Sequence, residues 1–320
     1  MTSKITNILL IGEKYTLYTN YFIFFIGIIG NFLNILVFTD LKIFQKNQCI
    51  LYFITESISN ICQLIIFFLI YLLISIYTID PANLILFWCK FRGMMITICT
   101  LISFSAICCS AFDQYLSTSP QFNLRKLSTI KLTEILIFTA MSISLLHSIS
   151  FCIFLEIQDS FCRIFDSIMS RYLSYFYYPI LSGILPIFIA SLFSILAYRN
   201  VRRIVQLQMP LVRRRLNQQL TAMVLARIIV FVFLTLPYAI QRMYIYLPNV
   251  EKTNHSRHAV DNLVERIISS FFNLNYAGSF YIFMASSWRF RRQTKNVLLK
   301  KFWRRWKRRP CNDNQIYPIG

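Results

Sequence analysis

Seven long apolar runs constrain the fold of this chain more than any other feature of its sequence. A helix needs about 20 apolar residues to cross the roughly 30 Å hydrocarbon core of a bilayer. The runs are Leu17–Thr39, Cys49–Tyr77, Phe87–Phe112, Leu132–Leu155, Tyr172–Tyr198, Leu220–Tyr246 and Ile267–Met284. They lack the period-two alternation of barrel strands, and backbone polar groups in lipid must pair within the chain. The sequence therefore predicts an all-α, integral membrane bundle of seven transmembrane helices.

The composition agrees with a membrane-embedded chain. Apolar residues make up 56% of the 320 residues and charged residues only 14%. A soluble protein cannot hide that much apolar surface in one core. We therefore expect a single membrane domain that includes all seven runs.

The basic residues indicate how this domain is oriented. The net charge is +20, and most of the 33 lysine and arginine residues follow the first, third, fifth and seventh runs. By the positive-inside rule, the N-terminus lies outside and the C-terminus in the cytoplasm. We expect a multi-pass plasma membrane protein with an extracellular segment at 1–16, a transmembrane domain at 17–286 and a cytoplasmic segment at 287–320. The spread of basic residues over separate loops argues against a nucleic-acid partner.

The stretch Trp288–Trp306 mixes basic residues with large apolar ones. It is too charged to cross a bilayer, and the pattern predicts a short amphipathic membrane-surface helix after the seventh span. Its basic side chains would be attracted to anionic lipid of the inner leaflet. The alternative is a disordered basic tail.

The positions of the cysteines predict one disulfide. Besides Cys89, six of the nine cysteines lie within the apolar runs, where cysteine is usually a small packing residue. Cys89 and Cys162 lie at outer positions, where the environment is oxidising, so we expect them to pair. Two modifications are compatible with this topology: a glycan on Asn254, in the sequon Asn254-His255-Ser256, and a palmitoyl chain on Cys311.

Asp113-Gln114-Tyr115 lies where the third run ends, opposite Cys89 at its other end. A carboxylate at the end of an apolar helix is costly to place in lipid and marks a functional position. This arrangement resembles the third helix of rhodopsin-like G-protein-coupled receptors, which usually have Asp-Arg-Tyr there. Other positions match the family in order and depth: Gly30-Asn31, Pro186, Phe231, Pro237 and Phe290-Arg291.

The resemblance covers nearly the whole chain and is nearest to a divergent branch of the neuropeptide receptors. It implies that the protein binds an extracellular peptide or small ligand and signals through a heterotrimeric G protein. The mechanism it implies is a change between two helix packings, with proline residues permitting kinks. In this interpretation the activation-switch residues are Asn31, Glu56, Asn60, Asp113, Gln114, Tyr115, Arg227, Phe231 and Pro237.

Four of the family's usual positions differ in this chain. Gln114 replaces the arginine of the triplet, and Asn60 replaces the aspartate that binds sodium. Thr235 replaces the sixth-span tryptophan, and Ser279–Phe283 replaces Asn-Pro-X-X-Tyr, so that the proline is lost. Together these differences put the family's standard activation mechanism in doubt.

Glu56 and Arg227 are two charged residues that lie well inside the predicted spans. Glu56 is one helical turn before Asn60 and on the same face. Its simplest role is a hydrogen-bonded acid that packs the bundle. Arg227 either extends to the inner headgroups or pairs with Asp113 or Glu56, which would compensate for the arginine missing at Gln114.

Family position also suggests the residues of a ligand pocket. They are Ile96, Tyr178, Tyr238, Gln241, Arg242, Glu265, Ser269 and Asn273. Ile96 occupies the place of the aspartate of amine receptors, which disfavours an amine ligand. Arg242 and Glu265 suit the carboxylate and amine of a peptide, or an amidated peptide with basic residues. Alternatively, they contact lipid headgroups or each other.

Three other functions remain open. The first is a seven-helix decoy or scaffold that binds ligand and couples weakly, which the altered switch positions favour. The second is a chemosensory receptor, including a ligand-gated channel with the opposite topology. The third is a membrane enzyme, but the three histidines show no metal-binding spacing, and no nucleophile and base lie at one depth. We therefore expect no enzymatic activity, no metal site and no cofactor.

Overall fold

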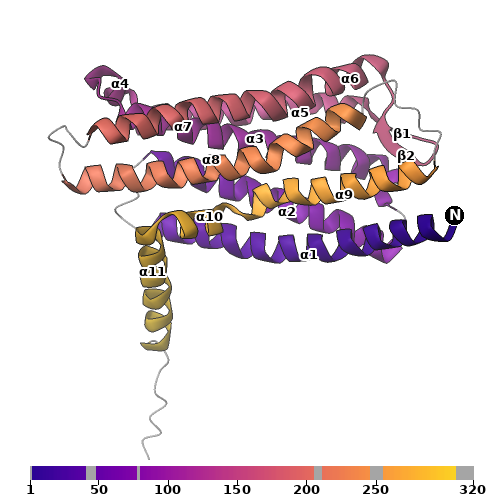
Figure 1. Ribbon diagram of the computed structural model, residues 1–320, viewed down its shortest axis with the longest axis horizontal. Helices are drawn as coiled ribbons and strands as arrows, with labels where there is room; N and C mark the ends of the chain where they lie inside the picture. The colour runs from indigo at the N-terminus through magenta and orange to yellow at the C-terminus, as the bar shows by residue number, and fades with distance from the viewer. Residues whose placement is uncertain (1, 41–47, 78–79, 205–210, 246–254, 308–320) are drawn as a thin grey trace, which may run out of the picture.

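The computed structural model describes residues 2–40, 48–77, 80–204, 211–245 and 255–307. Nearly all of this backbone is helical, and the long helices lie side by side along one axis (Figure 1). The prediction of an all-α bundle is therefore confirmed for this part of the chain.

The long helices follow the predicted apolar runs. They are α1 (Thr2–Asp40), α2 (Cys49–Tyr77), α3 (Leu86–Thr118), α5 (Ile130–Phe154), α7 (Leu185–Ile204), α8 (Leu211–Ile245) and α9 (His255–Ala277). Within the described residues, six helical segments are long and apolar enough to cross a membrane, and they match the first six runs. The seventh run is divided at Gly278 between α9 and α10 (Ser279–Ser286).

Helix α1 begins earlier than the sequence predicted. The predicted apolar run starts at Leu17, but the helix starts at Thr2 and continues without a break through the segment expected to be extracellular. The added turns contact α9, where Thr16 accepts a hydrogen bond from the Arg266 side chain at 3.4 Å. One turn further along, Asn273 donates to Asn20 at 3.4 Å. Polar contacts with α9 thus extend α1 beyond its apolar run.

The fifth run forms three consecutive helical segments. They are α6 (Ser167–Tyr172), a π-helix η2 (Leu173–Ile184) and α7. Pro186 has no N–H to donate to the preceding turn, which relaxes the hydrogen-bond register there. Pro179 lies inside the π-helix. The wider turns of η2 face the cavity described below.

One end of the bundle carries a β-hairpin, and we call it the disulfide end. Strand β1 (Leu155–Gln158) pairs antiparallel with β2 (Phe161–Ile164). Asp159 and Ser160 form the two-residue turn with φ of 51° and 61°, as a tight hairpin requires. A short 3-10 helix, η1 (Pro81–Asn83), lies beside β2, and the Asn83 side chain accepts from the Cys162 N–H at 2.9 Å.

The opposite end carries Asp113-Gln114-Tyr115, and we call it the triplet end. Here α4 (Phe122–Leu127) connects α3 to α5. Helix α11 (Trp288–Lys307) begins directly after α10 and points away from the bundle, nearly across its long axis (Figure 1). The predicted helix at Trp288–Trp306 is therefore present, with nearly the expected bounds.

This bundle buries polar side chains in its core and exposes many large apolar side chains on its outer surface. Asn31, Asn60, Gln63 and Arg227 are all buried. Every long helix has large apolar residues exposed on its outer surface, among them Phe22, Phe32, Phe138, Leu146, Phe188 and Phe233. Soluble proteins do not expose apolar patches of this extent. The distribution is the one expected of helices surrounded by lipid.

Candidate ligand cavity and buried polar network

The disulfide holds the hairpin over the end of the bundle. Cys89 near the start of α3 is bonded to Cys162 on β2, with 5.9 Å between their Cα atoms. The predicted pair is thus confirmed. Because Asn83 also binds the Cys162 N–H, β2 is held at two points next to the cavity.

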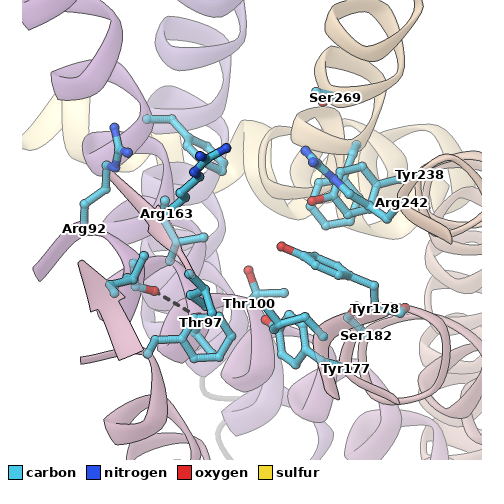
Figure 2. Close-up of a pocket in the computed structure, with 18 of the residues that line it drawn as sticks. Arg92, Thr97, Thr100, Arg163, Tyr177, Tyr178, Ser182, Tyr238, Arg242 and Ser269 are labelled. Carbon is cyan, nitrogen blue, oxygen red and sulfur yellow. Dashed lines mark hydrogen bonds between the residues drawn. The ribbon is translucent and has the colours of Figure 1, made fainter. Parts of the chain in front are cut away.

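A cavity of about 680 Å³ opens beneath this hairpin. Its walls come from α2, α3, β2, η2, α8 and α9 (Figure 2). The volume falls within the range typical of sites for drug-sized ligands. Six of the eight predicted pocket residues line it: Ile96, Tyr178, Tyr238, Arg242, Ser269 and Asn273. Gln241 and Glu265, the other two, lie outside the lining.

Arg242 is fixed on one side of the cavity by a salt bridge and by aromatic rings. Its guanidinium is 3.1 Å from a carboxylate oxygen of Glu265. It also lies over the rings of Tyr238 and Tyr178, at 5.0 and 5.8 Å from their centroids. Tyr238 in turn stacks on Phe272 with 3.9 Å between ring centroids. Of the interpretations left open for Arg242 and Glu265, contact with each other is the one the structure contains.

Several lining residues were missed by the sequence analysis. Figure 2 shows Arg92 and Arg163 across the cavity from Arg242. Arg92 forms a salt bridge with Asp80. Arg163 lies on β2, and no sequence signal foretold the hairpin that brings it there. Gln63 also lines the cavity. The sequence could have indicated this residue, because it is a glutamine within an apolar run, one turn after Asn60.

Glu56 and Arg227 form one buried ion pair. The Glu56 carboxylate on α2 accepts from two nitrogens of Arg227 on α8, both at 2.8 Å, and each side chain is only 2% exposed. Of the two partners considered for Arg227, the structure has Glu56 and not Asp113. Isolated charges are very costly in such surroundings, so each residue depends on the other.

This ion pair continues into a third helix. Arg227 also donates to the backbone oxygen of Asn275 at 3.0 Å and to its side-chain oxygen at 3.5 Å. The Asn275 amide donates to the Thr235 hydroxyl at 3.1 Å. The Thr235 hydroxyl therefore accepts a hydrogen bond inside the bundle. The chain Glu56–Arg227–Asn275–Thr235 connects α2, α8 and α9.

A neutral cluster lies beside this chain of bonds. The Asn31 amide donates to the backbone oxygen of Tyr276 at 2.7 Å. Asn60 donates to Asn31 at 3.4 Å and accepts from Ser103 at 2.8 Å. Ser279 donates to Asn31 at 3.4 Å. These contacts join α1, α2, α3, α9 and α10 through neutral groups.

At the triplet end, Gln114 connects α3 to α8. Its amide donates to the Thr221 hydroxyl at 2.8 Å and to the backbone oxygen of Asn217 at 3.2 Å. Asp113 faces another way and accepts from Ser128 at 2.7 Å. Tyr115 packs against Phe193 of α7, with 5.6 Å between ring centroids. Gln114 thus holds the two helices together through hydrogen bonds without a charge.

The remaining predicted switch residues lie between the cavity and the triplet end. Phe231 is fully buried and packs edge-on against Phe104, with 4.9 Å between ring centroids. Pro237 lies inside α8, which continues through it. Asn254 and Cys311 lie outside the described residues. Within the described residues, no cluster of histidine, cysteine or acidic side chains has an arrangement that would hold a metal ion.

Comparison with known proteins gives no family assignment. No protein-family model matches the chain, and no curated protein is significantly similar to it.

Proposed function

We propose that this chain is a seven-helix membrane receptor of the rhodopsin-like type that binds an extracellular peptide. The observation that carries the proposal is the combination of a cavity at one end of the bundle with buried polar contacts between helices in the core and at the other end. The cavity lies at the disulfide end, and Gln114 joins α3 to α8 at the other. Glu56, Arg227 and Asn275 link α2, α8 and α9 in the bundle core.

In this proposal α9 and α10 together form the seventh span. The Gly278 N–H donates to the Leu274 oxygen at 2.9 Å, and the Ile282 N–H donates to the Gly278 oxygen at 3.0 Å. These two bonds carry the hydrogen-bonding pattern across the break. In addition, α9 lies along α1 and α8 (Figure 1), as a member of the bundle would.

The proposed topology has the disulfide end outside the cell and the triplet end in the cytoplasm. Arg199, Arg202 and Arg203 lie at the end of α7, and basic residues also crowd α11. At the hairpin end, Asp80, Glu156 and Asp159 offset the basic residues Arg92 and Arg163. This asymmetry supports the orientation. Helix α11 would then lie on the inner leaflet, with its arginines near anionic lipid.

The proposed mechanism uses the contacts between α8 and its neighbours. A ligand that contacts Tyr238 and Arg242 acts on the part of α8 beyond Pro237, and proline permits a helix to bend. If the ligand binds one position of α8 more tightly than another, it shifts the population of molecules towards that position. Moving α8 away from α3 at the triplet end requires breaking the Gln114 hydrogen bonds. The surface exposed there would bind a heterotrimeric G protein.

The experiment is a screen of cells that express the full chain against a neuropeptide library, with calcium and cyclic-AMP readouts. We expect at least one peptide to give a dose-dependent response that untransfected cells lack. Tyr238→Ala should weaken its potency by about ten- to a hundredfold, because it removes a buried aromatic contact worth roughly 1.5–3 kcal/mol. Phe233→Ala is the matched control, since Phe233 lies on the outside of α8. A response that survives Tyr238→Ala unchanged would argue against this cavity.

A second candidate is a receptor that binds ligand but couples weakly. The observation that favours it is Gln114, which forms neutral bonds to α8 where the family has an arginine beside the aspartate. Introducing the arginine with Gln114→Arg should raise ligand-stimulated signalling severalfold if weak coupling is set at this position. Equal signalling by both forms at matched surface expression would remove the support for this candidate.

A further inference from the structure

The cavity contains one polar side chain whose hydrogen-bonding groups are unused. Gln63 lines the cavity and is fully buried, and neither its amide nitrogen nor its oxygen has a protein partner. Among the described lining residues it is the only one with buried side-chain polar atoms left unpaired. Leaving such groups unsatisfied costs about 1–3 kcal/mol each. A bound ligand that satisfies both would recover that free energy.

The pattern of these groups limits what the ligand can be. A side-chain amide presents one donor and one acceptor face side by side. The complementary partner is another amide, such as a peptide bond, which offers an acceptor and a donor at the same spacing. The neighbouring lining groups have partners already: Thr97 bonds to Gly93, Thr100 to Tyr276, and Asn273 to Asn20.

The charges around the cavity favour an acidic ligand. Among the described residues that line it, three are arginines and none is an aspartate, a glutamate or a lysine. Arg92 and Arg242 are paired with Asp80 and Glu265. Arg163 is exposed and lies over the Phe165 ring at 4.6 Å. Its cross-strand neighbour Glu156 accepts from Gln158 at 3.2 Å.

Aromatic rings form much of the remaining wall. They belong to Phe67, Tyr71, Phe151, Tyr177, Tyr178, Tyr238 and Phe272. Such a wall suits an aromatic or large aliphatic side chain. A cavity of about 680 Å³ can hold the end of a peptide but not a whole folded peptide.

We propose that the cavity binds a short acidic peptide segment whose backbone amide pairs with Gln63 and whose carboxylate lies against Arg163. This inference rests on the proposed function, since it concerns the ligand of the same cavity. It narrows the ligand from peptides in general to acidic ones, and it adds Gln63 and Arg163 as specificity-determining residues.

The test is a binding selection with the full chain purified in lipid nanodiscs. The probe is a library of N-acetylated tripeptide amides, each with one aromatic residue and one acidic, neutral or basic residue, and bound members are quantified by mass spectrometry. We expect acidic members to be enriched about tenfold over their basic counterparts. Gln63→Leu should reduce capture of acidic and neutral members alike by about tenfold, the effect of losing roughly 1.4 kcal/mol. Arg163→Gln should abolish the preference for acidic members and keep capture of neutral ones.

Two further variants keep the result interpretable. Gln219→Leu changes a buried glutamine of α8 that is not among the cavity-lining residues, so capture should match the wild type. Gln63→Met repeats the test with an unbranched side chain. Because the amide is unpaired without ligand, both Gln63 variants should be at least as thermally stable as the wild type. Failure of both to fold would show that Gln63 has a structural partner, and it would overturn the proposal.

The outcomes separate this inference from the receptor proposal, because peptide capture does not involve a G protein. Preferred capture of basic members, no capture, or capture unaffected by Gln63→Leu would each overturn the inference while leaving signalling by another ligand possible. Capture of acidic members that depends on Gln63, without any second-messenger response, would support the inference and contradict the signalling proposal.

Discussion

At the scale of single residues, the ion pair between Glu56 and Arg227 is the most unusual feature of this bundle. Both side chains lie within predicted transmembrane spans, and each is only 2% exposed. The sequence located both charges and proposed Glu56 as one of two partners for Arg227. It could not choose between them, because the choice depends on how far α8 is rotated towards α2. Nor could it find Asn275, whose contact with Arg227 requires the packing of α9.

Removing one member of this pair should be more harmful than removing both. Arg227→Met leaves the Glu56 carboxylate buried without its partner, which should lower the free energy of unfolding by about 3–5 kcal/mol. The double variant Glu56→Met with Arg227→Met should recover most of that loss, because a buried pair is often replaceable by apolar residues. Thermal denaturation of the purified chain measures both. A double variant no more stable than Arg227→Met would mean that the pair is not the source of the effect.

At the scale of elements, six of the seven predicted runs appear as long apolar helices, because length and hydropathy alone decide whether a segment suits lipid. The sequence did not foresee the π-helix η2, the hairpin or the extension of α1 to Thr2. These features arise from packing and from local hydrogen bonding, which a hydropathy pattern does not encode. Six of the eight residues predicted for a ligand pocket line the cavity, because their depth along the predicted helices was informative.

The contact between α1 and α9 depends on Gly27. A Cβ atom at this position would lie 2.9 Å from the Ala277 Cβ and 2.5 Å from the Leu64 Cδ1. Gly27→Val should therefore force the helices apart and destabilise the chain by about 1–3 kcal/mol. Phe25→Val is the control, since Phe25 is 58% exposed on the outer face of α1. The melting temperature in nanodiscs distinguishes them, and equal losses would contradict close packing at Gly27.

The disulfide should support the hairpin above the cavity. Cys162→Ser frees β2 from α3 and should cost about 2–5 kcal/mol of stability. Any ligand found in the peptide screen should also bind more weakly, because Arg163 and Ile164 of β2 line the cavity. Cys152→Ser, at a free cysteine of α5, should change neither property. Unchanged ligand affinity in a well-folded Cys162→Ser variant would show that the hairpin does not shape the site.

At the scale of the whole molecule, the number of spans decides where the two ends of the chain lie. Six spans would place them on the same side of the membrane, and seven would place them on opposite sides. We predict seven, with α9 and α10 together forming the last. Antibodies against tags at each end should label the N-terminal tag on intact cells and the C-terminal tag only after permeabilisation. Labelling of both tags on intact cells, or of neither, would exclude the seven-span arrangement.

We propose that a ligand in the cavity changes the helix packing at Gln114, and that a G protein binds the surface around this residue. The most direct measurement is guanine-nucleotide exchange on purified heterotrimeric G proteins, with the full chain in nanodiscs and a peptide identified by the cell screen. We predict that the peptide accelerates exchange by at least one G-protein class and that Tyr238→Ala reduces this effect while Phe233→Ala does not. A peptide that binds the cavity yet accelerates exchange by no class of G protein would contradict the claim.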